Sequence, residues 1–524
     1  MKVMGIVKKG EYYDSISIML IAKQVSEMDG VADSAVVMGT KANKSVLESS
    51  GLLPAELLSA GETDLIVAVK FRDEAEPDNV AAEVETVFKA LKKSDERETL
   101  APQSLEGALN VLPGANLAMI SVAGRFAGEV ALQAMRRGMH VFLFSDNVPL
   151  EREIELKKFA QQRKLFVMGP DCGTAIINGV PLAFANVVNR GKIGIVAASG
   201  TGLQEVSCII SNSGCGISQA IGTGGRDVRK EVGGIMFLES MNALAADEST
   251  EVVLLVSKPP ATEVVAKIIS AVRGIRKPVV GVFLGAPPEL LRGSNIHQAL
   301  TLEEAALLCV AISKKENVSA VADALKKHEA EIISMAKEEA AKQSSAQKYL
   351  RALYSGGTFC DEAQLLCQNV LSEVYSNIPF GTTKKLKDSW KSERHTILDL
   401  GDDEFTVGKP HPMIDYSTRN KRILLEAENP ETAVVLLDIV LGYGSNMNPL
   451  AEIIPVIKEV KNITAQQKRY LPVVCSVTGT DKDPQNRSTV VSALEAEGVK
   501  VMESNAAASN LAISIVKQRY TQQR

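Results

Sequence analysis

The chain has few of the residues on which nucleic-acid and metal sites depend. It contains one Trp, its aromatic content is 4%, and its net charge is −5. Neither base-stacking platforms nor a basic surface that follows phosphates is therefore expected. Its seven Cys show no CxxC or paired Cys/His spacing, which predicts neither a zinc site nor a disulfide framework. We expect no nucleic-acid partner and no metal.

Long apolar runs are also missing. Strands such as Val252 to Val256 are too short to span a bilayer. The N-terminal stretch Met1 to Lys9 lacks the long apolar core of a secretion signal. These absences predict a protein without membrane association, in a cytoplasmic location where its thiols stay reduced.

What the chain does have is a long alternation of short apolar strands and amphipathic helices. Its 524 residues suffice for several domains. Strands alternating with helices predict an α/β, multi-domain protein with parallel sheets. We expect a small N-terminal α/β unit of the βαββαβ type over 1–98, half of a nucleotide-type layer over 99–190, two repeat units over 191–312 and 346–524, and a Lys-, Glu- and Ala-rich helical linker over 313–345.

Two strand-turn-helix elements predict one shared anion site. Ile193 to Gly202 and Leu350 to Thr358 each place small residues and a hydroxyl where a helix begins. Such turns leave backbone N–H groups free at the positive end of a helix dipole. The predicted phosphate or acyl-phosphate contacts are Ser199, Gly200, Thr201 and Gly202, together with Ser355, Gly356, Gly357 and Thr358. The alternative is a pair of plain N-caps in tight turns.

The same landmarks follow each turn in the same order. A Gly/Asp turn comes next, at Gly222 to Asp227 and at Gly401 to Asp403. A TxVVLL strand and a PVV strand ending in Gly then follow in both halves. This order indicates an internal repeat of one α/β domain, unless short apolar strands are alike by chance.

Two further loops carry cationic side chains suited to an anionic substrate. Gly224, Gly225 and Arg226 follow a strand, and a guanidinium recognises planar carboxylate or phosphate groups. A capping Asp beside a surface Arg is the alternative. Lys409 and His411 lie in a loop stiffened by two prolines. This rigid cationic loop is predicted to bind a carboxylate or oxalyl group; the alternative is a purely structural loop.

Strand ends supply the remaining candidates. Because ligands bind at the carboxyl ends of parallel strands, Ser121, Ser145, Asp146 and Asn147 are expected near any ligand. Cys172 follows another strand, as a nucleophile or as a packing residue. Asp438 ends a buried strand and needs a partner, either the 442–444 loop or a ligand. No dedicated acid–base residue stands out, so the catalytic residues stay unassigned.

Gly169 to Thr174, followed by Gly191 to Gly202, resembles the α subunit of succinyl-CoA synthetase and related NDP-forming acyl-CoA synthetases. The segment from Ser355 to Glu362 is similar to the CoA-ligase domain of that family's β subunit. This resemblance implies Rossmann-like parallel sheets, with a CoA-binding-like domain over 99–190 and two flavodoxin-like succinyl-CoA-synthetase-type domains over 191–312 and 346–524. It also implies two helix N-termini facing one another across a phosphate.

A closer resemblance, to the FdrA family, spans nearly the whole chain. It rests on segments that include Phe144 to Asn147, Gly169 to Ala175, Gly222 to Asp227, Leu400 to Asp403 and Gly408 to Asp415. The resemblance implies an acyl-CoA synthetase-like protein and a subunit of oxamate carbamoyltransferase in allantoin (purine) catabolism. Such an enzyme moves a carbamoyl group between oxalurate and phosphate together with other protein subunits. A CoA or nucleotide would be supplied at a partner subunit.

The chain departs from the synthetase pattern at the phosphorylated His. The corresponding stretch, Leu291 to Ala299, contains His297 but lacks the glycine-rich flanks. No segment resembles an ATP-grasp domain, and the first CoA-binding turn is replaced by an unrelated N-terminal unit. Two alternatives stay open: an acid–CoA ligase subunit with His297 as phosphate carrier, and a non-catalytic scaffold or ligand-sensing subunit.

Overall fold

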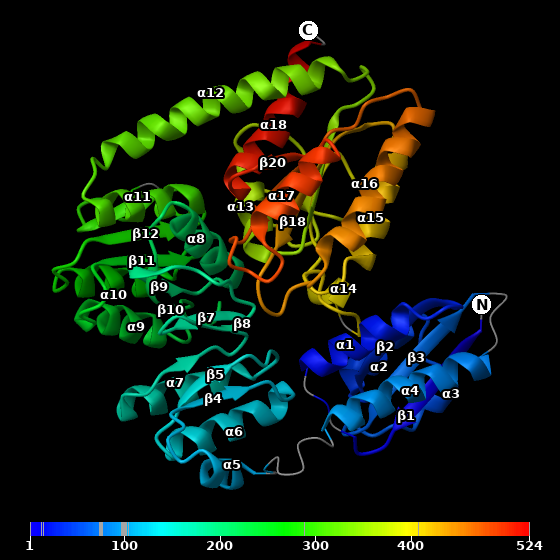
Figure 1. Ribbon diagram of the computed structural model, residues 1–524. Coiled ribbons are helices and arrows are strands. Elements are labelled where there is room, and N and C mark those ends of the chain that lie inside the picture. Colours follow the sequence, from blue (N-terminus) through cyan, green and yellow to red (C-terminus); the bar gives the residue numbers. More distant parts are fainter. Residues whose placement is uncertain are drawn as a thin grey trace.

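The described residues of the chain fold into an α/β protein with four sheets (Figure 1). The computed structural model describes residues 2–11, 13, 15–72, 77–95, 102, 104–287, 289–406 and 408–522. The predicted fold class, with parallel sheets and a small N-terminal α/β unit, is confirmed. The boundary expected at 98/99 lies outside the described residues. In the described part of the chain, no helix combines the length and apolar character needed to cross a membrane.

The N-terminal unit is an antiparallel sheet in the order β1-β3-β2. Its elements are β1 (Val3–Lys8), α1 (Ser15–Ser26), β2 (Val31–Met38), α2 (Lys41–Ser49), α3 (Ala55–Leu58), β3 (Leu65–Phe71) and α4 (Pro77–Asp95). The predicted βαββαβ pattern is therefore only partly met: in the described residues two short helices separate β2 from β3, and the sheet has three strands. Buried Ile21, Val67 and Phe88 belong to the core between this sheet and the helices α1 and α4.

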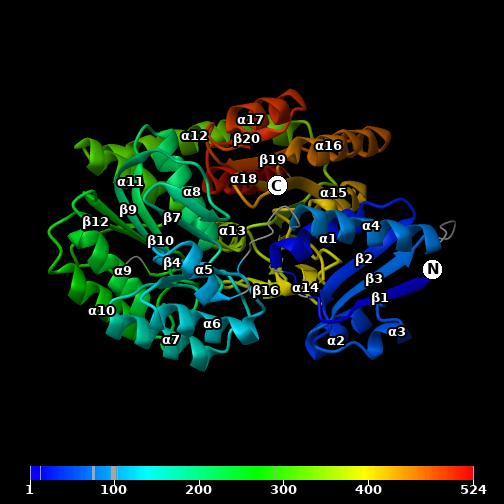
Figure 2. The same ribbon diagram turned by 60° about the horizontal axis from the view of Figure 1, so that its bottom comes forward.

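The second unit is a small parallel sheet in the order β4-β5-β6. It consists of α5 (Leu105–Val111), β4 (Leu117–Ile120), α6 (Gly124–Arg136), β5 (His140–Leu143), α7 (Leu150–Arg163) and β6 (Val167–Met168). In Figure 2, α6 and α7 lie in the lower left part of the view and the N-terminal unit lies to their right.

The first repeat is a seven-stranded sheet in the order β13-β12-β11-β9-β10-β7-β8. Its elements are β7 (Thr174–Ile177), β8 (Val180–Ala183), β9 (Arg190–Ala197), α8 (Gly200–Asn212), β10 (Ile217–Gly222), α9 (Ile235–Ala246), β11 (Val252–Ser257), α10 (Thr262–Val272), β12 (Val279–Phe283), β13 (Ile296–Ala299) and α11 (Leu302–Lys314). The hairpin β7–β8 precedes the boundary expected at 190/191, yet β7 pairs with β10. This sheet therefore begins at Thr174.

The second repeat is also seven-stranded, in the order β16-β15-β17-β14-β18-β19-β20. Its elements are β14 (Tyr349–Tyr354), α13 (Gly357–Gln368), β15 (Val374–Ser376), β16 (Lys384–Lys385), β17 (His395–Asp399), α14 (Asp403–Thr406), α15 (Ser417–Glu428), β18 (Thr432–Val440), α16 (Pro449–Gln466), β19 (Val473–Thr478), α17 (Arg487–Ala496), β20 (Lys500–Met502) and α18 (Asn505–Gln522).

The strand order confirms the internal repeat. In each sheet the strand before the predicted anion turn, β9 or β14, lies between the strand before the Gly/Asp turn, β10 or β17, and the TxVVLL strand, β11 or β18. The PVV strands β12 and β19 come next, and each repeat closes with a helix, α11 or α18. The short strands β15 and β16 extend the second sheet beyond β17.

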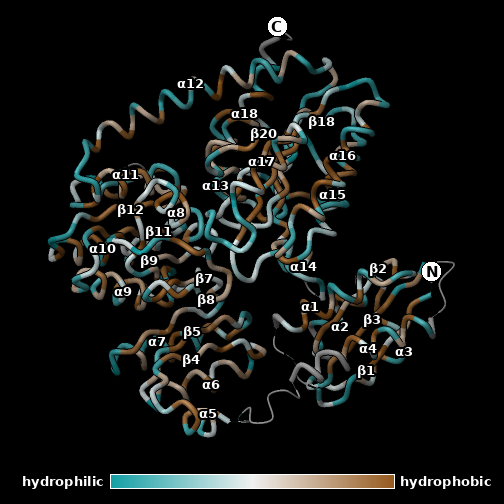
Figure 3. The backbone as a smooth tube through the Cα atoms, in the orientation of Figure 1, coloured by the Kyte–Doolittle hydropathy of each residue, from teal (hydrophilic) through white to brown (hydrophobic). Residues whose placement is uncertain are grey.

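One hydrophobic core joins the two repeats. It combines Leu203 and Val206 of α8 with Phe359 of α13 and Leu511 of α18, all fully buried. The long helix α12 (Ser319–Ala341) crosses from α11 to α18 at the top of Figure 1. It buries few of its residues, and Figure 3 shows hydrophilic stretches along it. Because the repeats share a core, their facing helices are held in a fixed relation.

Candidate functional site

The two predicted helix starts lie against one another. The Ser199 Oγ and Thr358 Oγ1 atoms are 2.7 Å apart. Ser199 is the N-cap of α8, in extended backbone, and its Oγ accepts a hydrogen bond from the Gly202 N–H at 3.1 Å. A Cβ on Gly202 would lie 2.3 Å from the Ser199 Oγ, so a larger residue there would displace the Ser199 side chain from its cap position. The predicted convergence of the two turns is confirmed; what they bind stays a prediction.

Free backbone donors gather at this contact. The first N–H groups of a helix have no partner within the helix. Those of Gly200 and Thr201 in α8, and of Gly357 and Thr358 in α13, also have no acceptor elsewhere in the described chain. Both helices thus present unpaired donors and the positive end of a dipole, which favours an anion.

The turn before α13 is held by a carboxylate of the protein itself. Asp438 accepts hydrogen bonds from the Ser355 N–H and hydroxyl, both at 2.8 Å, and from the Gly356 N–H at 2.9 Å. The fully buried Arg419 donates to the Asp438 main-chain oxygen at 2.6 Å. Asp438 therefore bonds the turn rather than the 442–444 loop. The donors of Ser355 and Gly356 are already used, and those of Gly357 and Thr358 stay available.

The α8 side opens into a small pocket of about 20 Å³. The volume exceeds the 10–15 Å³ that one water molecule needs. Glycine dominates the wall: a Cβ on Gly222 would lie 2.3 Å from the Thr174 oxygen, and one on Gly224, whose φ is +80°, would lie 2.4 Å from the Pro170 oxygen. The lining residues are Asp171, Cys172, Gly173, Thr174, Ala197, Ser199, Gly200, Gly222, Gly224 and Gly225. The predicted glycines Gly224 and Gly225 thus lie beside the Ser199 turn.

Arg226 contributes to this region through an ion pair of its own. Its Nε lies 2.8 Å from Glu153 Oε2 of α7, and its Nη2 donates to the Val148 oxygen at 2.8 Å. Glu153 also pairs with Lys157, which in turn pairs with Asp227 at 2.8 Å. The Arg226 guanidinium thus links the second unit to the first repeat. Because its donors are used in these contacts, Arg226 is less free to bind a substrate.

The two cationic side chains of the 408–412 loop point in different directions. The Lys409 Nζ lies 3.2 Å from Asp33 of the N-terminal unit, and the Val36 N–H donates to the Gly408 oxygen. His411 is on the site side: a Cβ on Gly401 would lie 2.7 Å from its Nε2. Burial lowers the pKa of His411 to about 4, so its ring is neutral near pH 7. The loop therefore links the N-terminal unit to the site.

Asp399, the last residue of β17, faces the α13 helix start. A Cβ on Gly357 would lie 2.9 Å from its Oδ2. Burial, then the nearby Asp361 and Asp402 carboxylates, raise its pKa to about 7. Sequence reasoning missed this residue, although the signal was present: Asp399 occupies the strand end that precedes the Gly401 turn. Lys258 of the first repeat approaches the same helix, 2.6 Å from Asp361.

The other candidates are less suited to catalysis. Burial raises the pKa of the Cys172 thiol to about 12, so it is no nucleophile near neutral pH. His297 is exposed on β13, which forms the end of the sheet and pairs with β12. Ser145 is buried, and its hydroxyl donates to the Ile120 oxygen at 3.4 Å. Ser121 Oγ is buried without a hydrogen-bond partner in the described chain. Asp146 and Asn147 are exposed beside Ser145.

Three family profiles match the chain. A CoA-ligase profile matches residues 353–515, a CoA-binding-domain profile matches 188–285, and a profile described as the heavy metal-associated domain of AllF matches 1–103. The CoA-binding match thus falls on the first repeat, whereas the sequence resemblance implied such a domain over 99–190.

The metal that the N-terminal profile's name suggests does not fit the residues present. Residues 1–103 contain neither Cys nor His. Across the described ranges, no group of three or more His, Cys, Asp or Glu side chains is arranged to hold a metal ion. Soft heavy metals prefer thiolate and imidazole ligands, so no metal chemistry follows from this match.

Similar proteins agree with the profiles. The uncharacterized protein YahF of Escherichia coli is 42% identical over 485 residues, 92% of each chain. The α subunit of ADP-forming succinate–CoA ligase from Staphylococcus aureus is 28% identical over 33% of this chain, which spans 59% of that subunit. A dinucleotide-forming acetyl-coenzyme A synthetase from Ca. Korarchaeum cryptofilum is 14% identical, over 78% of this chain and 84% of that one, with a TM-score of 0.33. The chain belongs to the YahF family, as an AllF-type protein with CoA-binding and CoA-ligase domains.

Proposed function

We propose that this CoA-ligase-like protein is a subunit of an oxamate carbamoyltransferase-type enzyme, which moves a carbamoyl group between oxalurate and phosphate. The main support for this proposal is the 2.7 Å contact between Ser199 Oγ and Thr358 Oγ1, which places two helix N-termini side by side. The unpaired N–H groups of both helices would hold the phosphate of carbamoyl phosphate.

Carbamoyl transfer to or from phosphate requires mainly that the reactants are oriented and that the charge on the phosphate is stabilised. A phosphate oxygen attacks a carbamoyl carbon in one direction and leaves it in the other. Fixed donors that favour the phosphate's charge, and that hold it next to the carbamoyl acceptor, lower the barrier in both directions. The glycine wall at Gly222, Gly224 and Gly225 lets a small planar group approach the backbone closely.

Two further observations support the proposal. The N-terminal profile carries the name AllF, consistent with a role in allantoin breakdown. The sequence resembles the FdrA family nearly throughout, and that family includes an oxamate carbamoyltransferase subunit. We therefore expect other protein subunits to join the chain and to supply any CoA or nucleotide.

The competing proposal is an acid–CoA ligase subunit, which the CoA-ligase and succinate–CoA ligase matches favour. It needs a phosphate carrier, and His297 is the candidate. That residue lies within β13, whose backbone pairs with β12 along Ile296 to Ala299. A carrier loop would have to leave this ladder, which makes the carbamoyl proposal the better supported one.

Ligand-dependent thermal unfolding of the full chain separates these functions. Carbamoyl phosphate and inorganic phosphate should each raise the Tm, and CoA should not. Stabilisation by CoA, together with acid-labile phosphohistidine after incubation with labelled ATP, would support the ligase. If none of these ligands stabilises the chain, the anion site is refuted and a scaffold role is favoured.

Replacing Gly200 with Val tests the helix start directly. The nearest atom to a Cβ at this position, Thr174 Oγ1, lies 3.6 Å away, so the fold has room for the first carbon of the new side chain. The branched side chain would cover the free N–H groups and abolish stabilisation by phosphate. Gly114→Val is the matched control, because no atom lies within 4 Å of a Cβ there. A full phosphate response in Gly200→Val would contradict the proposal.

A further inference from the structure

Asp171 lines the same pocket as Ser199 and Gly200. Its main-chain N–H donates to the Ser145 oxygen at 3.0 Å, which fixes the loop. Its carboxylate has no hydrogen bond or ion pair within the described part of the chain. Its φ of 55° lies in the left-handed region, which is uncommon for residues other than glycine but is adopted by Asp more readily than by most. The carboxylate is thus placed at the pocket without a structural partner.

Four charged groups, each from a different segment of the chain, act on the Asp171 carboxyl. Asp171 as a residue is exposed at the pocket, but the protein around its carboxyl group partly desolvates it. This desolvation, followed by the Asp146 carboxylate, raises its pKa to about 6. Asp403 of α14 and Glu153 of α7 act in the same direction, and Arg226 opposes them. A carboxyl that titrates close to the working pH can both accept and release a proton.

The proposed carbamoyl transfer needs such a group. An oxygen of hydrogenphosphate attacks the ureido carbon of oxalurate, forming a C–O bond, and the bond from that carbon to the substituted nitrogen breaks. The electron pair of the broken bond goes to the nitrogen, which must gain a proton to leave as the amide of oxamate. Hydrogenphosphate loses one proton in the same reaction. The reaction therefore balances with no external acid, provided one group carries the proton from oxygen to nitrogen.

We propose that Asp171 carries this proton: its carboxylate takes the proton from the attacking hydrogenphosphate and gives it to the departing nitrogen. This inference rests on the proposed function. The other polar side chains that line this pocket are poorly suited to the step. The Thr174 hydroxyl donates to the Phe184 oxygen at 2.7 Å. Cys172 is a buried neutral thiol, and Ser199 already holds Gly202 and Thr358.

The test uses the complex co-purified with its partner subunits and measures phosphate-dependent release of oxamate from oxalurate. Asp171→Asn should lower kcat by about 10²- to 10⁴-fold, the usual contribution of a positioned acid–base group. Stabilisation by phosphate should persist, because the backbone donors are unchanged. Asp171→Glu should recover part of kcat. An Asp171→Asn complex with wild-type kcat would overturn the inference.

The pH profile supplies a readout that a purely structural role would not move. Activity should rise with pH as Asp171 loses its proton. Phosphate itself titrates near neutrality and contributes to the pH profile. The profiles of wild type and Asp146→Asn are therefore compared, because the contribution of phosphate is the same in both and any difference comes from the protein. Removing the Asp146 charge lowers the pKa of Asp171, and the rising limb should move to lower pH. If the rising limb of the pH profile is the same in wild type and in Asp146→Asn, the inference is overturned. This test does not need the Asp171→Asn variant, so it still applies if that variant folds poorly. A wild-type complex without carbamoyl transfer instead refutes the proposed function, before any variant is considered.

Discussion

Glu205 and Glu362 occupy the same position in the two repeats, and each caps a helix of the other repeat. Each is the sixth residue of its helix, α8 or α13. The Asn505 N–H at the start of α18 donates to Glu205 at 2.8 Å, and the Leu302 N–H at the start of α11 donates to Glu362 at 2.8 Å. This exchange of caps holds the two helix starts, at Ser199 and Thr358, in register.

Glu205→Gln should stabilise the protein at alkaline pH. Burial raises the pKa of Glu205 to about 7, above the ordinary 4.5. The folded state therefore binds an extra proton, and the stability that this proton contributes is present below about 4.5 and lost as pH rises through 7. A neutral amide avoids that loss while keeping an acceptor for Asn505. We expect on the order of 1–3 kcal/mol more stability than wild type at pH 8 and little difference at pH 5.

Urea unfolding of wild type and Glu205→Gln at both pH values measures this effect. Glu362→Gln should behave alike, because burial also raises the pKa of Glu362 to about 7. An equal difference at pH 5 and pH 8 would show that the charge is not the cause.

Asp399→Asn should strengthen phosphate binding above pH 7. The pKa of Asp399 is raised to about 7, so its carboxyl is neutral below that pH and charged above it. A charged carboxylate beside Gly357 repels an anion at the α13 helix start. We expect a roughly tenfold gain in affinity at pH 8, about 1.4 kcal/mol, and none at pH 5.5. Calorimetric titration with phosphate at both pH values checks it; a weaker affinity at pH 8 would assign Asp399 a supporting role instead.

Asp438→Ala should destabilise the second repeat strongly. The substitution leaves the buried Arg419 without its carboxylate partner and frees the donors of the Ser355 turn. Removing one member of a buried ion pair typically costs about 3–5 kcal/mol. Asp438→Asn keeps an acceptor and should cost less. Chemical denaturation compares the two; equal losses would mean that charge contributes little to this contact.

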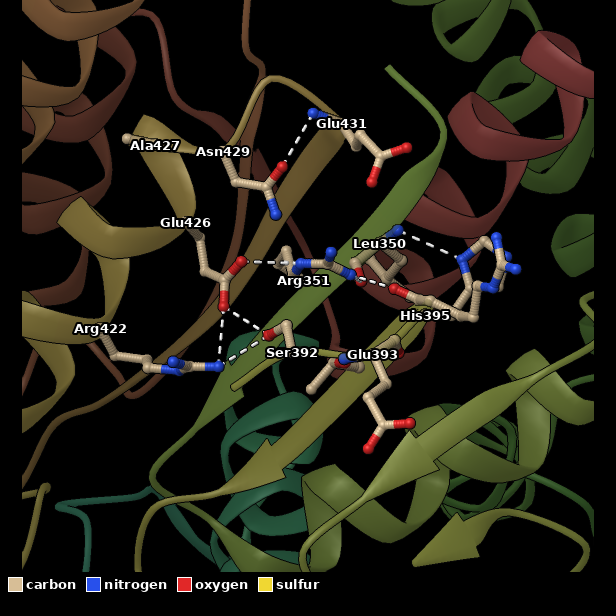
Figure 4. Close-up of polar contacts among 12 residues, drawn as sticks. Leu350, Arg351, Ser392, Glu393, His395, Arg422, Glu426, Ala427, Asn429 and Glu431 are labelled. Carbon is tan, nitrogen blue, oxygen red and sulfur yellow. Dashed lines mark hydrogen bonds and ion pairs between the residues drawn. The ribbon is translucent and has the colours of Figure 1, made fainter. Parts of the chain in front are cut away.

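Glu426→Ala should destabilise the opposite end of the same sheet. Figure 4 shows Glu426 of α15 between Arg351 of β14 and Arg422, and its oxygens lie 2.7 and 2.9 Å from their guanidinium nitrogens. All three side chains are buried. The loss leaves two buried cations without their carboxylate partner, which should cost about 3–5 kcal/mol or more.

The matched control is Glu251→Ala. Glu251 pairs with Lys192 at 2.6 Å, but both side chains are largely exposed. A pair of this kind contributes at most about 1 kcal/mol. Similar losses in the two variants, read from urea midpoints, would contradict the role of burial.

The sequence was most informative about strands and turns. The periodic apolar runs around Val252 and Val435 predicted buried parallel strands, and their matching order predicted the repeat. Ser199 and Thr358 could be expected to meet because both begin helices that follow a central strand. Strands and helix starts depend mainly on residues that are close in the sequence, so they could be predicted from short sequence patterns.

Side-chain partners were much harder to predict. Asp438 lies 83 residues beyond the Ser355 turn that it bonds, and Lys409 lies 376 residues from Asp33. Pairings across such distances depend on which strands become neighbours in a sheet and on how domains dock, and no periodicity reports either. Arg226 is an example. A guanidinium can bind an anionic substrate, which is why the sequence predicted this role, but in the structure Arg226 forms an ion pair with Glu153 of the second unit.

The helix α12 has a consequence for how the site assembles. It joins the repeats in one polypeptide and packs along α18, so each helix start has its counterpart at a high effective concentration. Dilution cannot separate the two halves, and their stoichiometry is fixed at synthesis. An anion site divided between two chains would require both to be produced in balance, whereas here a single translation event delivers the complete pair.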